Sequence, residues 1–201
     1  MENKHIYLSV DLDYWSTEFP IHLFEQIVAS PLSKIVVVSH EELLPHINSH
    51  VDKFDTLVNV DYHSDLASFT PAEPTFPCEE GTWANFIDGS KDKTFIWSPP
   101  DEKCKNHNTG YCHGYIYPNP FGTKKAKVSG WKLAKIKMRF IPPLSECVAV
   151  GISLSPLWSA SSVLTQFSKW LPTIKDHFEI KRGVKASLKQ VNIVRKCGPW
   201  N

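Results

Sequence analysis

The residues best suited to chemistry form an Asp-x-His-x-Asp motif, made of Asp61, His63 and Asp65. The motif directly follows the largely apolar run 57–60, which is typical of a strand buried on both faces. Because side chains alternate along an extended chain, the three ionisable groups point to one side. Buried charges must be paired or bind a metal ion, so the motif favours a shared cation. The alternative is a polar turn at a strand end that happens to contain two aspartates.

Two earlier strands end in the same kind of residue. Asp11 and Asp13 follow the apolar run 6–10, and His40 follows the largely apolar run 35–39. Open parallel sheets bind ligands just beyond the carboxyl ends of their strands. The sequence therefore predicts a metal site at one sheet edge, with six candidate ligands: Asp11, Asp13, His40, Asp61, His63 and Asp65.

The arrangement resembles the arginase/deacetylase (ureohydrolase-like) superfamily of metallohydrolases and is closest to short arginase-like proteins. The arginase pattern places a histidine after a strand and an Asp-x-His-x-Asp motif a little over twenty residues later. Here His40 stands 21 residues before Asp61, and the motif matches in full. The resemblance covers about the first third of the chain.

The chain departs from the arginase pattern at the third motif, an Asp-x-Asp pair that the family has at a later strand end. In the expected place, after the run 148–152, this chain has Ser153 and Ser155, which offer hydroxyl groups and no carboxylate. The only Asp-x-Asp pair on a strand is Asp11 and Asp13. The resemblance therefore implies a permuted sheet order, with this pair moved to the N-terminus.

Carried over residue by residue, the resemblance implies one or two divalent ions that share ligands. One ion would have four ligands, His40, Asp61, Asp65 and Asp11. The other would have His63, Asp61, Asp11 and Asp13, so that Asp11 and Asp61 bridge the pair. Carboxylate and imidazole ligands without thiolate suit Mn²⁺ or Fe²⁺, and Zn²⁺ is a further candidate. The implied function is metal-dependent hydrolysis of a C–N bond in a guanidino or amide substrate by a metal-activated water.

Two further residues are candidates for catalysis. Glu80 lies in an acid-Gly-x-Trp segment that short arginase-like proteins also have near the metal, and the resemblance implies that it donates a proton to the leaving amine. The alternative is an ordinary helix start with Trp83 as a core residue. His113 is a second candidate that would face the metal. It belongs to a cluster with the residue types of a zinc site but not the common spacing, which favours free thiols instead: Cys104, His107, Cys112 and His113.

Composition indicates an ordinary globular protein. The chain has 201 residues, 42% hydrophobic and 21% charged, with a formal net charge of +1, which indicates neither a nucleic-acid nor a membrane partner. It has no apolar run of about 18 residues or more, and its N-terminus shows no signal-peptide pattern. Five cysteines, an odd number, indicate free thiols and a cytoplasmic location. The expected partner is a small-molecule or modified side-chain substrate.

Strands alternate with helices in the first third of the chain. Strands are expected at 6–10, 34–39 and 54–60, with helices at 21–29 and 41–48, and this order predicts a parallel sheet covered by helices. The predicted fold is a single α/β domain over 1–201, an arginase-like three-layer sandwich with a mainly parallel sheet and a loop-rich insertion at 68–130. Further along the chain we expect a short helix at 79–87 and strands at 94–98, 131–140 and 146–152. A helix is expected at 157–171, capped by Ser155 and ended by Pro172. The tail at 178–193 mixes strand-like and helix-like signals.

Two other functions are consistent with the same residues. A descendant that keeps the fold without catalysis would act as a binding or regulatory protein, as the serines at 153 and 155 would allow. A dinuclear phosphoesterase would use a similar set of aspartates and histidines, but the sequence has no clear asparagine or additional histidine ligand cluster downstream.

Overall fold

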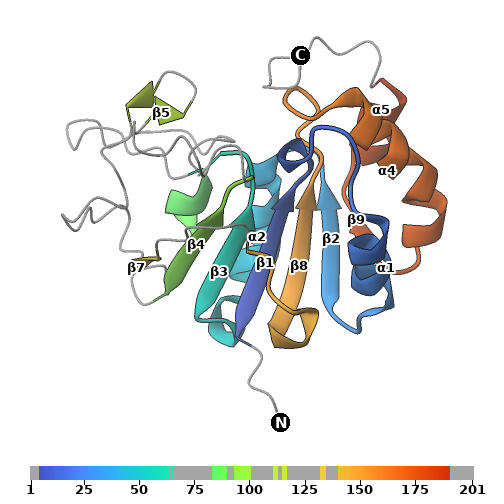
Figure 1. The fold of residues 1–201 in the computed structure, drawn as a ribbon. Helices are drawn as coiled ribbons and strands as arrows, with labels where there is room; N and C mark the ends of the chain where they lie inside the picture. The colour runs from blue at the N-terminus through green and yellow to red at the C-terminus, as the bar shows by residue number, and fades with distance from the viewer. Residues whose placement is uncertain are drawn as a thin grey trace.

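The apolar runs of the sequence form a seven-stranded sheet in the computed structural model (Figure 1). The structure describes residues 5–63, 65, 83–89, 93–100, 111–112, 115–116, 132–134 and 140–190. The sheet consists of β1 (Ile6–Asp11), β2 (Ser33–Val37), β3 (Thr56–Val60), β4 (Thr94–Ser98), β7 (Lys132–Ala134), β8 (Cys147–Ser153) and β9 (Glu179–Ile180). All neighbouring strands pair in parallel, in the order β7-β4-β3-β1-β8-β2-β9. A separate antiparallel pair joins β5 (Tyr111–Cys112) and β6 (Tyr115–Ile116).

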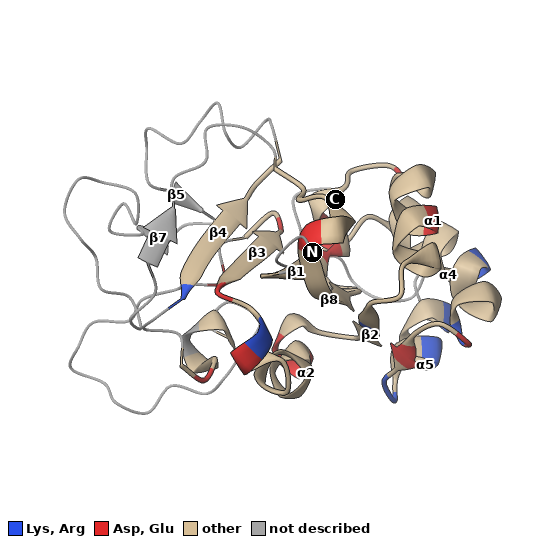
Figure 2. Ribbon diagram, turned by 90° about the horizontal axis from the view of Figure 1, so that it is seen from below, with Lys and Arg blue, Asp and Glu red and all other residues tan. Residues whose placement is uncertain are grey.

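Helices connect the strands and cover both faces of the sheet. The α-helices are α1 (Ile21–Ala29), α2 (Leu44–Asn48), α4 (Ser161–Ile174) and α5 (Val184–Lys189). Short 3₁₀ helices are η1 (Leu12–Tyr14), η2 (His40–Leu43), η3 (Val51–Lys53), η4 (Trp83–Phe86) and η7 (Leu144–Glu146). Figure 2 shows α1 and α2 on opposite sides of the sheet. The prediction of an α/β fold with a parallel sheet is confirmed, and the layers are consistent with a three-layer sandwich.

Two hydrophobic cores lie on the two faces of the sheet, as the alternation of side chains requires. Leu8 and Val10 of β1 belong to the larger core, which also contains residues of α1, α4 and α5. Tyr7 belongs to the second core, together with Leu43 of η2 and Trp83 of η4. Side chains at odd-numbered positions of β1 therefore face η2 and η4. The face to which each position of β1 points therefore decides which polar side chains can come together beyond the strand ends.

Several element bounds differ from those predicted. The helix expected at 157–171 begins four residues later and continues through Pro172. Its last turn is retained because Ile174, two residues beyond the proline, is fully buried. Ser155 is not its N-cap, because Ala160 occupies that position. The expected helix at 41–48 divides into η2 and α2, and Pro45 is accommodated in the first turn of α2, where its missing N–H has no partner to lose.

The remaining predictions fall partly on residues that the structure does not describe. The strand expected at 131–140 is described only as β7, and the helix expected at 79–87 only as η4. The strand predicted at 94–98 is confirmed as β4. Most of the predicted insertion at 68–130 lies outside the described residues, so it stays a prediction. The tail has a short strand, β9, and a short helix, α5. Within the described part of the chain, no helix is both long enough and apolar enough to cross a membrane.

Gly151 of β8 allows η2 to pack closely on the sheet. A Cβ atom at this position would lie 2.7 Å from Leu43 Cδ2 and 2.8 Å from the Tyr7 hydroxyl oxygen, distances that real contacts do not allow. Leu43 is the last residue of η2, the element that begins with His40. The absence of a side chain at Gly151 therefore helps to place His40 against the end of β1.

We expect Gly151→Ala to lower the free energy of unfolding by about 1–3 kcal/mol, because the added methyl group overpacks the second core. Urea unfolding measures the loss. In a Leu43→Ala background the same change should be milder, because the two clashing Leu43 methyl groups are gone and only the Tyr7 hydroxyl remains close. An equal loss in both backgrounds would show that the contact with Leu43 is not the cause.

Candidate metal centre

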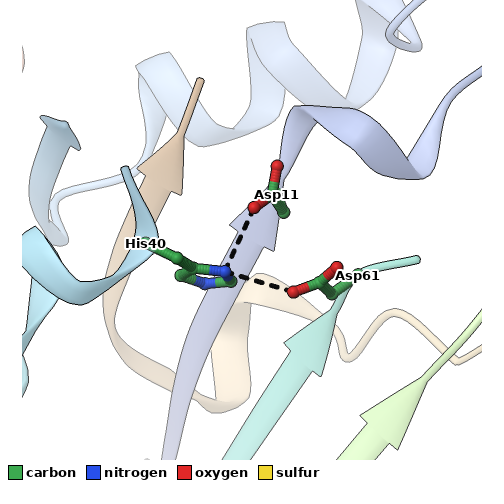
Figure 3. Close-up of side chains that lie close together, drawn as sticks. All are labelled: Asp11, His40 and Asp61. Atoms are coloured by element: carbon green, nitrogen blue, oxygen red, sulfur yellow. Dashed lines mark ion pairs between the residues drawn. The ribbon is translucent and has the colours of Figure 1, made fainter. Parts of the chain in front are cut away.

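Three strand ends deliver the candidate ligands to one point of the sheet edge (Figure 3). Asp11 is the last residue of β1, and Asp61 directly follows β3. These strands are parallel neighbours with Val10 opposite Val60, so the two aspartates leave the sheet side by side. His40 comes from β2, which β8 separates from β1. Residues 38–39 connect β2 to His40 and pass across the end of β8, so that the His40 side chain reaches the two carboxylates.

The His40 imidazole lies in the centre of the first group of ligands. Its Nδ1 atom lies 3.1 Å from Asp11 Oδ2, 3.1 Å from Asp61 Oδ2 and 2.9 Å from Asp65 Oδ2. The other ring nitrogen, Nε2, lies 2.6 Å from Ser9 Oγ in a hydrogen bond. Nδ1 itself is buried and has no hydrogen bond of acceptable geometry within the described part of the chain. If Nε2 carries the proton, the Nδ1 lone pair faces three carboxylates, an arrangement that a cation would stabilise.

A second group lies next to the first and shares Asp61. His63 Nδ1 lies 2.8 Å from Asp13 Oδ2 and 3.7 Å from Asp61 Oδ1. In each of the two groups, Asp11–His40–Asp61 and Asp13–Asp61–His63, the candidate ligand atoms lie within 4.8 Å of one another. Asp61 thus turns one carboxylate oxygen towards each imidazole. The arrangement has the form of two adjacent cation positions with a common carboxylate.

Backbone N–H groups hold three of the carboxylates in place. The N–H of Asp13 donates to Asp11 Oδ1 at 3.0 Å, and the N–H of Tyr62 donates to Asp13 Oδ1 at 3.2 Å. The N–H of His63 donates to Asp61 Oδ1 at 2.7 Å. These bonds orient the acids through the local turns after β1 and β3, so the two turns are part of the site.

Side chains outside the ligand set support Asp61, Asp65 and His40. Asn59 Nδ2 donates to Asp61 Oδ2 at 3.2 Å, and the indole N–H of Trp83 donates to Asp65 Oδ2. The Trp83 ring also stacks on His40, with ring centroids 4.5 Å apart and planes at 29°. Such outer partners fix the orientation of metal ligands in characterised metalloproteins. Trp83 is indeed a core residue, and it also contacts two candidate ligands.

Burial and neighbouring charges change the pKa values of three of the aspartates and of both histidines. Desolvation and neighbouring carboxylates raise the pKa of Asp11 and Asp13, and they raise the pKa of Asp61 from 3.8 to about 7. Burial opposes the charged form of the histidines, but the acids beside them outweigh it. They raise the pKa of His63 from 6.5 to about 9 and that of His40 well above its usual range. Without a cation, the site therefore retains protons.

The donor set fits a divalent ion. Four carboxylates and two imidazoles are oxygen and nitrogen ligands, which hard and borderline divalent ions accept. The distances from His40 Nδ1 to the three carboxylate oxygens are 2.9–3.1 Å. Around an octahedral ion with bonds of about 2.1 Å, neighbouring ligand atoms lie about 3.0 Å apart, so the spacing in this site fits such an ion. Buried Asp and His groups of this site could therefore hold a metal ion.

The structure brings together the six residues that the sequence singled out, with one difference in their grouping. Asp11 does not belong to the second group, so Asp61 alone is shared between the two groups. Asp65 contacts His40 in the first group. The other candidates, Glu80, His113, Cys104 and His107, lie outside the described residues, and only the backbone of Cys112 is described. Their roles stay predictions.

Sequence reasoning missed the supporting residues, although two of them left a signal. Ser9 and Asn59 are polar residues inside buried apolar strands, each two positions before a ligand. The alternation of a strand places such a residue on the same face as the ligand that follows it. The roles of Trp83 and Ser155 depend on contacts between distant parts of the chain and have no comparable local signal.

No protein family, curated protein or solved structure matches this chain.

We expect the metal-free protein to lose stability as the pH rises. The folded-state pKa values of Asp61, about 7, and His63, about 9, exceed the ordinary values of 3.8 and 6.5. The folded state thus binds extra protons, and its stabilisation is complete below the ordinary pKa values and lost as the pH rises through the raised ones. Thermal unfolding in a chelator between about pH 5 and about pH 9 measures this loss.

A divalent ion should reverse this trend, because it binds only the deprotonated ligands. The rise in melting temperature on adding Mn²⁺ should therefore increase with pH. Asp61→Asn is the control, since it removes one titrating group and should flatten the pH dependence in chelator. A wild-type melting temperature that stays constant across this range would contradict the assignment.

Proposed function

We propose that the protein is a metal-dependent hydrolase that cleaves a C–N bond in a guanidino or amide substrate. The observation that carries the proposal is the shared position of Asp61 between two Asp/His groups at one strand edge. Asp11, His40 and Asp65 would hold one ion with it, and Asp13 and His63 the other. When bound, such a pair of ions supplies Lewis acidity and lowers the pKa of the attacking water.

The chain itself would determine how substrate reaches the site. The side chains of Asp11, Asp61, Asp65 and His40 are each at most 5% exposed, whereas that of His63 is 20% exposed. Substrate would therefore approach from the His63 side. The rings of Tyr62 and Trp158 contact His63 at centroid distances of 5.4 and 5.3 Å, which places two aromatic side chains beside this approach.

Mn²⁺ is the ion that we propose first, with Fe²⁺ and Zn²⁺ as alternatives. The ligand set contains oxygen and imidazole donors and no thiolate among the described ligands, a combination that suits Mn²⁺ and Fe²⁺. The substrate class comes from the resemblance of the His40 and Asp-x-His-x-Asp motifs to those of arginases. On the same basis, Glu80 is proposed to protonate the leaving amine.

Metal binding tests the proposal directly. We expect the wild type to bind about two equivalents of Mn²⁺, as the two groups of ligands require. Asp61→Asn should lower the Mn²⁺ affinity of both sites by at least about 100-fold. Loss of a residue that only supports a ligand already lowers metal affinity by up to about 100-fold, and Asp61 is itself a proposed ligand. Asp55→Asn is the matched control, because Asp55 precedes the same strand at its other end and is exposed. Calorimetry of Mn²⁺ binding and metal analysis after dialysis give the two readouts.

The outcome also separates the metallohydrolase from a metal-free binding protein. Wild type that binds no divalent ion, or Asp61→Asn that binds as wild type does, would overturn the proposed function. Loss of only one ion in Asp61→Asn would contradict the bridging position of this carboxylate.

A substrate panel tests the reaction. We expect the Mn²⁺-loaded protein to release urea or ammonia from guanidino compounds, or amine from acylated amines. Phosphodiesters should remain intact. Activity should fall to background in Asp61→Asn and persist in Asp55→Asn. Cleavage of phosphodiesters alone would instead identify a phosphoesterase.

A further inference from the structure

Ser155 combines burial with an unfavourable backbone conformation. It is 2% exposed and has a φ angle of +39°, in the region that side chains rarely adopt. Among the residues that the structure describes, the only other non-glycine residue with positive φ is Asp65, a candidate metal ligand. Strained residues of this kind cluster at functional sites, where the surrounding structure holds them in place. Within the described part of the chain, both such residues lie at the candidate metal centre.

The Ser155 hydroxyl is bonded to a candidate ligand. Ser155 Oγ donates to Asp11 Oδ2 at 2.5 Å and lies 2.9 Å from Ser153 Oγ. A hydroxyl has only one proton to donate, so Ser153 must be the donor in the second bond. The result is a chain of hydrogen bonds, Ser153 to Ser155 to Asp11, in which each bond polarises the next. Its end point, Asp11 Oδ2, is the oxygen that lies 3.1 Å from His40 Nδ1.

The backbone around Ser155 fixes the direction of this hydroxyl. The N–H of Ser155 donates to Val38 O at 2.9 Å, which joins the turn after β8 to the link that carries His40. On the other side, the N–H groups of Trp158 and Ser159 both donate to Ser155 O at 2.9 Å. Three backbone hydrogen bonds therefore hold Ser155 in place, with its side chain directed towards Asp11.

We propose that Ser155 is a positioning residue that fixes Asp11 Oδ2 as a ligand for the ion held with His40 and Asp61, with Ser153 orienting its hydroxyl. This inference rests on the proposed metal-dependent function. A turn with positive φ is most easily formed by glycine, so a role in the backbone alone does not require serine. The hydroxyl bond to Asp11 does require it. Because Asp11 belongs to only one of the two groups, the effect should be confined to one ion.

Two substitutions separate the hydroxyl from the backbone. Ser155→Ala and Ser155→Gly both remove the hydroxyl, but only glycine relieves the positive φ, so the glycine variant should melt at the higher temperature of the two. If Ser155 positions Asp11, both variants should lose affinity for Mn²⁺ at one site by a similar factor of about 10–100. The second site should keep its wild-type affinity. Titration followed by the electron paramagnetic resonance signal of free Mn²⁺ resolves the two sites.

Ser159→Ala is the matched control. Ser159 is 1% exposed in the same turn, but its hydroxyl donates to Leu154 O at 2.7 Å and not to a candidate ligand. This variant should lose stability while both Mn²⁺ affinities remain unchanged. Ser153→Ala should weaken the same site as the Ser155 variants by a smaller factor, because the hydroxyl of Ser155 remains but is less well oriented.

Each other result overturns the inference. If Ser155→Gly binds Mn²⁺ as the wild type does and the less stable Ser155→Ala binds it more weakly, the backbone conformation and not the hydroxyl determines the Mn²⁺ affinity. Equal weakening of both sites would contradict the assignment to the Asp11 position. Wild type that binds no Mn²⁺ would overturn the proposed function and this inference together, whereas normal binding by the wild type and by both Ser155 variants would overturn the positioning role alone.

Discussion

The structure depends on the burial of several negative charges in one small space. Asp11, Asp13, Asp61 and Asp65 are each at most 3% exposed, and their oxygens crowd around two imidazoles. Such a cluster is unfavourable unless protons or cations balance it. Burial raises the pKa of Asp61 and the neighbouring acids raise that of His63, so the cluster favours bound protons. The parallel strands, the turns after them and the packing of η2 all serve to keep these groups together.

The order of the strands explains how residues far apart in the chain meet. β1 lies in the middle of the sheet, between β3 and β8, so its C-terminal end is the natural centre of the ligand set. β3 brings the Asp-x-His-x-Asp motif to one side of Asp11, and β8 brings Ser153 and Ser155 to the other. The serines stand where the resemblance to arginases leads one to expect carboxylates. In this chain Ser155 donates to Asp11 and contacts Ser153, so the two hydroxyls support a candidate ligand at the end of β1.

The sequence alone predicted the parts of the site that follow from local rules. The ends of β1 and β3, and the histidine after β2, could be recognised because each apolar run stops at an ionisable residue and parallel strands share one carboxyl edge. The interactions between distant residues could not be predicted. Ser155 and Asp11 are 144 residues apart, and nothing near Ser155 in the chain indicates a positive φ or a buried partner. The predicted cap at Ser155 was wrong for the same reason, because its hydroxyl bonds to Asp11.

The unequal exposure of the two imidazoles has a consequence for the order of events at the site. His40 is 1% exposed and lies under the stacked ring of Trp83, whereas the His63 side chain is 20% exposed. Within the described part of the chain, the His63 side of the site is thus the more exposed one. If each group holds an ion, as proposed, the inner ion beside His40 would load first and the outer ion beside His63 would be released first. An inner ion acquired during folding would be retained through purification, while the outer one would exchange with the medium.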